Sequence, residues 1–250
     1  TTEIYTLSLH DALPICIVLS MMLRFPDSGW KPACMTATTS SGPAKVDLMR
    51  EQMLKTSTFK GLWICYTIGT LAGLTAIGIA GPVGKEVFAN AGLSADVANS
   101  LIFALILPFA IFNGAGRPLF GALTDKLSPK KTAIITYVLI IVACLVIYTG
   151  YNSVWAYIVS FCILWGCLGG WLAIAPTATA SYFGMKDNAR NYGLVYTAYG
   201  AGAIIGGIVS AQAKDILGAF QPFFLIVAGL AVVGIVLAIT LLKSPVMKSA

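Results

Sequence analysis

Long stretches without charge constrain this chain more than any other feature. Five stretches are uncharged or nearly so: 62–80, 101–123, 132–150, 154–180 and 220–242. A sixth stretch, 192–213, is equally long but rich in Gly, Ala and Tyr. Each meets the length of about 20 residues that a helix needs to cross a hydrocarbon core of about 30 Å. The apolar residues do not alternate with polar ones, which argues against a barrel wall. We therefore predict an all-α membrane protein with six transmembrane helices.

The charges support this prediction and indicate its orientation. The chain is 58% hydrophobic and only 10% charged, against about 25% charged in soluble domains. If the six spans cross the membrane alternately, 13 of the 16 Lys and Arg residues lie on one side. Lys85 and Lys214 lie on the other side, and Arg117 lies within a span. Such asymmetry predicts that both ends of the chain are cytoplasmic, in an inner or plasma membrane. The sequence lacks a stripe of basic residues interleaved with aromatic ones, so we predict no nucleic-acid partner.

Residues typical of metal sites and catalytic triads are scarce. The six cysteines form no CxxC pair, and His10 is the sole histidine. A buried thiol in an apolar span is more often a small hydrophobic side chain than a metal ligand. We therefore predict no enzyme, no metal site and no cofactor.

The start of the chain differs from the rest. Residues 1–15 resemble a translated sequencing-adapter read-through, with a natural amphipathic leader as the alternative, and we treat them as a non-native leader. Residues 16–23 are too short to span a membrane and are interpreted as the stump of a preceding helix. A cytoplasmic linker is predicted at 24–60, with a surface helix around 46–55 that places Val46, Met49 and Met53 on one side. A six-helix bundle at 61–242 and a cytoplasmic tail at 243–250 follow.

Arg117 is the only charge in the second span. A guanidinium at that depth costs roughly 2.5–3.5 kcal/mol on insertion scales, so it needs a partner or an aqueous cavity. This predicts a transporter for small anions. The alternative is an arginine that snorkels to the interface, because Thr124 lies only about 10 Å along the helix.

The turn after this span carries a recognisable pattern. Gly121, Asp125, Lys126 and Lys130 follow the spacing G-x-x-x-D-K-x-x-x-K between two spans, which resembles the signature loop of the major facilitator superfamily. The resemblance implies a gating role, in which a charge cluster holds helix ends together in one conformation. The alternative is an ordinary basic loop.

A closer resemblance covers residues 24–242. The segments FPDSGWKPA, MLKTSTFKGLW, FNGAGRPLFG and YFGMKDNARNYGLVYTAYGAGAIIGG resemble the oxalate:formate antiporter family, which is related to monocarboxylate transporters. The resemblance implies the C-terminal half of a twelve-helix fold, with an N-terminal six-helix half missing here, and Arg117 as the partner of the substrate carboxylate. Asn113 stands where proton-coupled relatives carry Asp, and Tyr199 stands where oxalate-specific relatives carry Lys. These departures favour exchange of a monoanion such as formate, pyruvate or lactate over oxalate.

Three tyrosines and several small residues complete the prediction. Tyr192, Tyr196 and Tyr199 share one helix face, and the deeper Tyr199 and Tyr196 are predicted to bind substrate together with Arg117 and Asn113. Weaker aromatic candidates are Trp63, Tyr66, Trp165 and Trp171, and the pairs predicted to allow close helix packing are Gly69/Gly73, Gly166/Gly170 and Gly202/Gly206.

The predicted function is secondary transport of small carboxylates by alternating access within a lipid bilayer. Two alternatives remain open at this point. One is a facilitator for neutral or drug-like solutes in which Arg117 is structural. The other is a membrane sensor or accessory protein that transports nothing.

Overall fold

The computed structural model describes residues 47–243 and Met21. Within 47–243, a short helix precedes six long ones: α2 (Arg50–Leu54), α3 (Ser57–Asn90), α4 (Ala95–Leu127), α5 (Pro129–Thr149), α6 (Val154–Phe183), α7 (Asn188–Leu217) and α8 (Gln221–Leu241). All six long helices are long and apolar enough to cross a membrane, which confirms the predicted fold class. The predicted leader, the stump apart from Met21, most of the linker and the tail beyond Lys243 lie outside the described residues.

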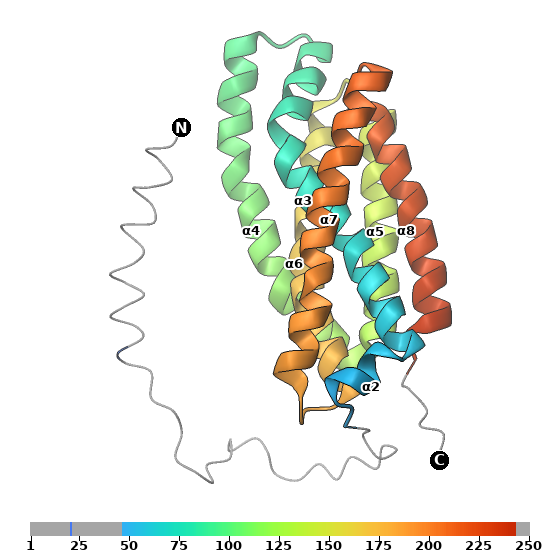
Figure 1. Ribbon diagram of the computed structural model, residues 1–250. Coiled ribbons are helices and arrows are strands. Elements are labelled where there is room, and N and C mark those ends of the chain that lie inside the picture. The colour runs from blue at the N-terminus through green and yellow to red at the C-terminus, as the bar shows by residue number, and fades with distance from the viewer. Residues whose placement is uncertain (1–20, 22–46, 244–250) are drawn as a thin grey trace. The chain divides into compact units, whose positions relative to one another are not determined.

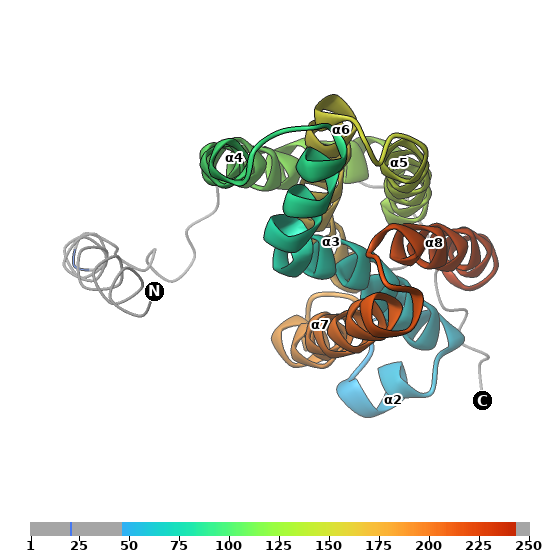
Figure 2. The same cartoon turned by 90° about the horizontal axis from the view of Figure 1, so that it is seen from above.

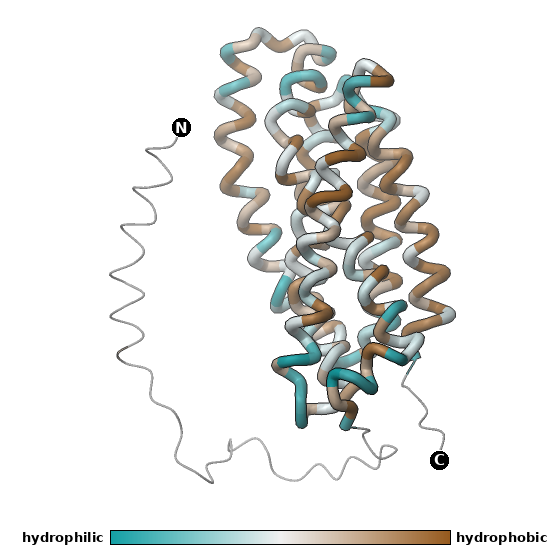
Figure 3. The backbone as a smooth tube through the Cα atoms, in the orientation of Figure 1, coloured by the Kyte–Doolittle hydropathy of each residue, from teal (hydrophilic) through white to brown (hydrophobic). Residues whose placement is uncertain are grey.

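The six long helices stand side by side and run alternately up and down (Figure 1). Seen from above, α3 lies at the centre of the bundle (Figure 2), where it packs against α4, α6, α7 and α8. The middle of the bundle is hydrophobic and the hydrophilic residues gather at its two ends (Figure 3). We call the end where α3 begins the α2 end. The turns α4–α5 and α6–α7 also lie there.

Local sequence determines where several helices begin and end. The side chains of Thr56 and Ser153 each accept a hydrogen bond from a backbone N–H in the first turns of α3 and α6. Such caps satisfy amides that have no partner within the helix. Gly184 and Gly218 follow α6 and α7 with φ of 85° and 75°, a conformation that glycine adopts without steric cost. These residues set the short turns that keep neighbouring helices together.

The predicted glycine pairs do pack closely, which confirms their interpretation. At five of the six positions an added methyl group would overlap a neighbouring helix. The contacts are Gly69 with Trp171, Gly73 with Leu168, Gly170 with Phe120, Gly202 with Thr70 and Gly206 with Thr75. A methyl group on Gly166 would lie 3.6 Å from the Phe112 carbonyl oxygen, which is an ordinary contact. Close backbone approach through small residues is the usual way membrane helices pack.

A polar network that the sequence did not predict joins helices at the end opposite the α2 end. Helix α3 continues past the predicted span end at 80 and therefore carries Glu86 near its last turn. The Glu86 carboxylate accepts hydrogen bonds from the Tyr151 hydroxyl at 2.7 Å and from the Phe220 backbone N–H at 3.3 Å, and it forms an ion pair with Lys214. One half-buried carboxylate thereby connects α3, α7 and two turns.

Candidate functional site

The position of Arg117 depends on a close contact between α4 and α6. A methyl group on Gly116 would overlap the carbonyl oxygen of Gly166, and one on Gly169 would overlap the carbonyl oxygen of Asn113. The backbones of the two helices therefore touch at this level. Because neighbouring helix residues are about 100° apart, packing Gly116 against α6 turns Arg117 away from α6.

Asn113 reinforces this contact. Its side-chain Nδ2 donates a hydrogen bond to the Trp165 carbonyl oxygen at 2.9 Å, and it lies one turn before Arg117 on α4. The amide predicted to orient the guanidinium therefore also joins α4 to α6. The sequence offered no signal for this partner, because Asn113 and Trp165 are 52 positions apart.

Arg117 lies in the half of α4 that is nearer the α2 end, and its side chain is exposed in this chain. It precedes the end of α4 by ten residues, or about 15 Å along the helix, and follows the start of α4 by 22 residues, or about 33 Å. Neither of the two ion pairs found among the described residues involves Arg117. Its charge lies within electrostatic range of the Tyr199 hydroxyl on α7. The guanidinium and the predicted tyrosine thus act on the same region.

The three tyrosines of α7 form one contiguous row, as their spacing predicted. The rings of Tyr196 and Tyr199 stack with centroids 5.2 Å apart and planes 9° apart. Tyr192 lies 5.7 Å from Tyr196. Tyr66 of α3 extends the row inward, with its ring 6.5 Å from Tyr196 and 6.4 Å from Tyr199.

Other weakly predicted aromatics lie close to this row. The indole N–H of Trp63 donates to the Thr197 hydroxyl at 2.9 Å and so joins α3 to α7. Trp171 of α6 stacks on Tyr66 with centroids 5.9 Å apart. The rings of Trp165 and Phe109 of α4 have their centroids 5.6 Å apart. Tyr66 and Trp171 therefore join the tyrosine row of α7, whereas Trp165 belongs to a separate aromatic group with Phe109.

The predicted gating residues lie at the α2 end, but they form no charge cluster among the described residues. Asp125 and Lys126 are exposed, and Asp125 takes part in neither of the ion pairs present in 47–243. Lys130 instead donates to the Ile239 carbonyl oxygen of α8 at 2.8 Å. Gly121 has only an ordinary contact, because a methyl group there would lie 3.7 Å from Ala173. The exposed charges are therefore free to meet a surface outside this bundle.

A single residue connects α4 to α5 in this turn. Ser128 is the one non-glycine residue with positive φ, 110°, among those the structure describes. Its carbonyl oxygen accepts from the backbone N–H of Thr132 at 3.1 Å and from the Thr132 hydroxyl at 3.1 Å. The α4–α5 turn is thus short and conformationally restricted.

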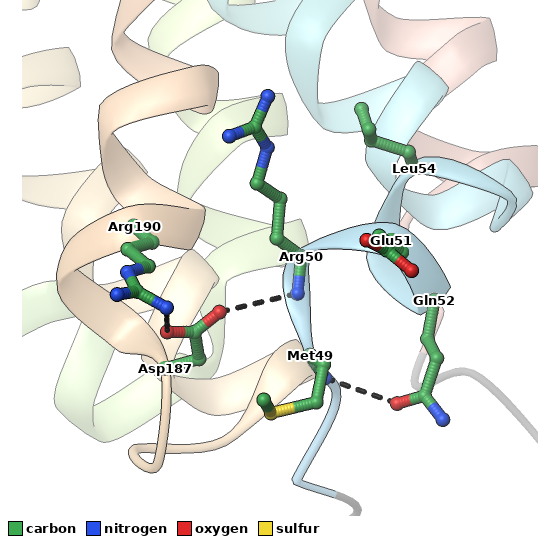
Figure 4. Close-up of a pocket in the computed structure, with 7 residues that line it drawn as sticks. All are labelled: Met49, Arg50, Glu51, Gln52, Leu54, Asp187 and Arg190. Carbon is green, nitrogen blue, oxygen red and sulfur yellow. Dashed lines mark hydrogen bonds and ion pairs between the residues drawn. The ribbon is translucent and has the colours of Figure 1, made fainter.

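The segment before α3 docks on the α6–α7 turn; we call residues 47–50 the strap. The Leu48 N–H donates to the Phe183 carbonyl oxygen at 2.8 Å, and the buried Asn191 side chain donates to the Leu48 carbonyl oxygen at 2.9 Å. The Arg50 N–H donates to Asp187 at 3.2 Å (Figure 4). These bonds fix the start of the bundle against residues more than 130 positions away.

The strap corrects the predicted surface helix around 46–55. The helix spans only Arg50–Leu54. Leu48 and Met53 are buried, whereas Met49, predicted on the same side as Met53, is 46% exposed. Val46 lies outside the described residues. The extended strap turns Leu48 inward because its backbone pairs with the α6–α7 turn, which no helical periodicity can indicate.

A pocket of about 630 Å³ lies beside the strap, away from Arg117. Figure 4 shows the residues that line it, Met49, Arg50, Glu51, Gln52, Leu54, Asp187 and Arg190. Both oxygens of the Asp187 carboxylate are engaged, one by the Arg50 N–H and the other by Arg190 at 3.8 Å. Two arginines and two carboxylates balance each other there. We interpret the pocket as the edge of the docked strap.

Replacing Asp47 with alanine is expected to loosen the strap. One oxygen of this carboxylate accepts from the backbone N–H groups of Met185 at 2.9 Å and Lys186 at 3.3 Å. Losing these exposed bonds should cost about 1 kcal/mol and speed hydrogen exchange at the two amides about fivefold. Glu51→Ala, at an exposed position in the same region, is the control. Equal exchange in the two variants would contradict the docking.

Comparison with known proteins defines the family. Residues 64–250 match the sequence profile of the Major Facilitator Superfamily. The chain belongs to this superfamily. Because its members are membrane transporters, the prediction that the chain is not an enzyme is confirmed, and the six helices of the bundle are those of a facilitator fold.

Two relatives are recognisable at low identity. The chain is 26% identical over 216 residues to the oxalate:formate antiporter of Oxalobacter formigenes, covering 86% of this chain and 48% of that protein. It is 25% identical over 167 residues to the uncharacterized transporter YhjX of Escherichia coli strain K12, covering 66% of this chain and 40% of that protein. The chain therefore spans about half the length, or less, of these relatives. The predicted resemblance to the antiporter family is confirmed at this distant level.

Proposed function

We propose that this facilitator half belongs to a secondary transporter that exchanges small carboxylates. The observation that carries the proposal is Arg117, the only charge within the apolar stretch 101–123, which pairs with no described carboxylate and has Tyr199 as an electrostatic neighbour. A guanidinium presents a planar fork of donors that matches a carboxylate. The distant similarity to an oxalate:formate antiporter supports the same substrate class.

A second six-helix half is part of this proposal. Facilitator pathways lie at the interface of two structural repeats, near the bilayer midplane. Helices α4 and α7 carry Arg117 and the tyrosine row. In the most apolar 18-residue segments of these two helices, only 17% and 28% of the residues are buried inside this bundle. The exposed turn charges Asp125 and Lys126 would then act as a latch against the other half. We place the α2 end in the cytoplasm, because Lys85 and Lys214 are the only basic residues at the opposite end of the described bundle.

A monoanion is the preferred substrate in this proposal. Arg117 is the one cation deep in the apolar stretches, and the resemblance to the antiporter family implies that Tyr199 stands where oxalate-specific relatives carry Lys. A second carboxylate left without a partner in a low-dielectric site would be costly. Formate, pyruvate and lactate therefore fit better than oxalate.

Counterflow in vesicles tests the substrate class. The complete transporter, recovered with its upstream reading frame, should exchange labelled formate and pyruvate faster than oxalate and should not carry glycerol. Tyr199→Lys should raise the ratio of oxalate to formate exchange about tenfold, since one added pairing of about 1.4 kcal/mol changes affinity by that factor. Tyr192→Lys, nearer the start of α7, is the matched control. Glycerol uptake without carboxylate exchange would contradict the proposal.

A further inference from the structure

Tyr66 is buried, yet its hydroxyl has no hydrogen-bond partner among the described residues. Its side chain is 0% exposed. Leaving a buried hydroxyl unpaired costs about 1–3 kcal/mol, so such groups need an explanation. Two other fully buried tyrosines do have partners, because Tyr137 donates to the Cys65 carbonyl oxygen at 2.6 Å and Tyr157 donates to the Ala80 carbonyl oxygen at 2.9 Å. The unpaired hydroxyl is therefore specific to the position of Tyr66.

The Tyr66 hydroxyl has the three tyrosines of α7 as electrostatic neighbours. Tyr192 is the first of them, and its hydroxyl interacts with that of Tyr66 although the pair does not reach hydrogen-bond geometry. The stacked rings of Tyr196 and Tyr199 contact the Tyr66 ring and are themselves partly exposed. A ligand at the exposed side of this stack is thus one side-chain layer away from the unpaired hydroxyl.

Tyr66 and Arg117 lie at similar distances from the ends of their helices near the α2 end. It follows the first residue of α3 by nine positions, or about 14 Å measured from the α2 end. Arg117 lies about 15 Å from the same end along α4. Tyr199 lies about 17 Å along α7, eleven positions after Asn188. Tyr66, Arg117 and Tyr199 therefore lie at similar distances along their own helices from the α2 end.

Trp171 has a second unpaired polar group nearby, but it does not serve the same purpose. Its indole N–H has no hydrogen-bond partner in the described bundle. The ring packs directly on α3, because a methyl group on Gly69 would overlap the indole nitrogen. The helix backbone therefore covers this N–H. Tyr66 is left as the buried donor that faces the tyrosine row.

We propose that Tyr66 is a substrate-binding residue whose hydroxyl donates to the carboxylate held by Arg117. This inference rests on the proposed carboxylate transport. An ionised carboxylate only accepts hydrogen bonds and has sites for several donors, so a guanidinium and a phenol can bind it together. The Tyr196–Tyr199 stack covers the hydroxyl in this structure and must shift aside when the anion binds. Binding then supplies the partner that the hydroxyl lacks.

The test compares Tyr66→Phe with Tyr157→Phe in the complete transporter, by formate counterflow and thermal unfolding. Tyr66→Phe should raise the half-saturating formate concentration about tenfold, as for a lost hydrogen bond to a charged group, with an unchanged or higher unfolding temperature. Tyr157→Phe removes a satisfied bond and should lower the unfolding temperature with unchanged half-saturation.

Each other outcome has a distinct meaning. Unchanged half-saturation in Tyr66→Phe, with wild-type exchange intact, overturns the role of Tyr66 and leaves the proposed function standing. An unfolding temperature lowered as much as in Tyr157→Phe shows that the hydroxyl has a structural partner and overturns the inference as well. A wild-type protein that exchanges none of formate, pyruvate and oxalate contradicts the proposed function and this inference together.

Discussion

Replacing Arg117 with lysine is expected to lower carboxylate exchange about a hundredfold. The lysine ammonium keeps the charge but loses the planar fork of donors that binds both carboxylate oxygens. Losing one partner of a buried charged hydrogen-bonded pair costs about 2–5 kcal/mol, and each 1.4 kcal/mol is a factor of ten. Arg117→Gln, which also removes the charge, should abolish exchange. Initial rates of formate counterflow in vesicles containing equal amounts of transporter measure both effects.

Arg190 provides the matched control for this experiment. It is an exposed arginine at the start of α7, 3.8 Å from Asp187, far along the helix from Tyr199. Arg190→Lys should leave formate counterflow unchanged. If Arg117→Lys also exchanged formate at the wild-type rate, Arg117 could not be the anion partner. A structural role at the membrane interface would then explain the guanidinium.

A methyl group at Gly116 is expected to separate α4 from α6 and to prevent most of the protein from folding. The added Cβ would overlap the Gly166 carbonyl oxygen and lie 3.2 Å from the Gly170 nitrogen. Both are backbone atoms, so no side chain can rotate away. Overpacking of this kind costs about 1–3 kcal/mol or more, and α4 has its main contact with α6. Gly116→Ala should therefore lower both the unfolding temperature and the yield of monodisperse protein.

Gly114 makes this prediction specific. It lies two residues earlier on the same helix, and nothing lies within 4 Å of an added methyl group. Gly114→Ala should be neutral or stabilising by about 0.5–1 kcal/mol, because alanine restricts the unfolded chain and favours a helix. Equal unfolding temperatures for Gly114→Ala and Gly116→Ala would show that the helices are not in backbone contact. The comparison separates local helix preference from packing between helices.

The sequence predicted those features of the fold that depend only on residues close together in the chain. The six spans follow from apolar length alone, and the structure places a helix over each of them. The close contacts of Gly202 and Gly206 with α3 follow from small residues at helical spacing. The row of Tyr192, Tyr196 and Tyr199 follows from positions that share one helix face. Each of these predictions needed only the neighbours along the chain.

The sequence showed no sign of contacts that join residues far apart in the chain. Asn113, predicted to orient the guanidinium, also joins α4 to α6 through Trp165. Lys130, predicted as a gating residue, bonds to the end of α8. Tyr66 was ranked below the α7 tyrosines, because no sequence pattern shows that a hydroxyl will be buried without a partner.

The amino-acid sequence by itself determined that this chain is a bundle of six membrane-spanning helices with Arg117 as the single cation deep in their apolar stretches. That outcome follows from transfer free energies and backbone hydrogen bonding, which act residue by residue in an apolar solvent. The tertiary structure alone decided which groups on different helices lie close together, such as Tyr66 of α3 against Tyr196 and Tyr199 of α7. Helix packing sets those relations, and packing depends on contacts between residues far apart in the chain.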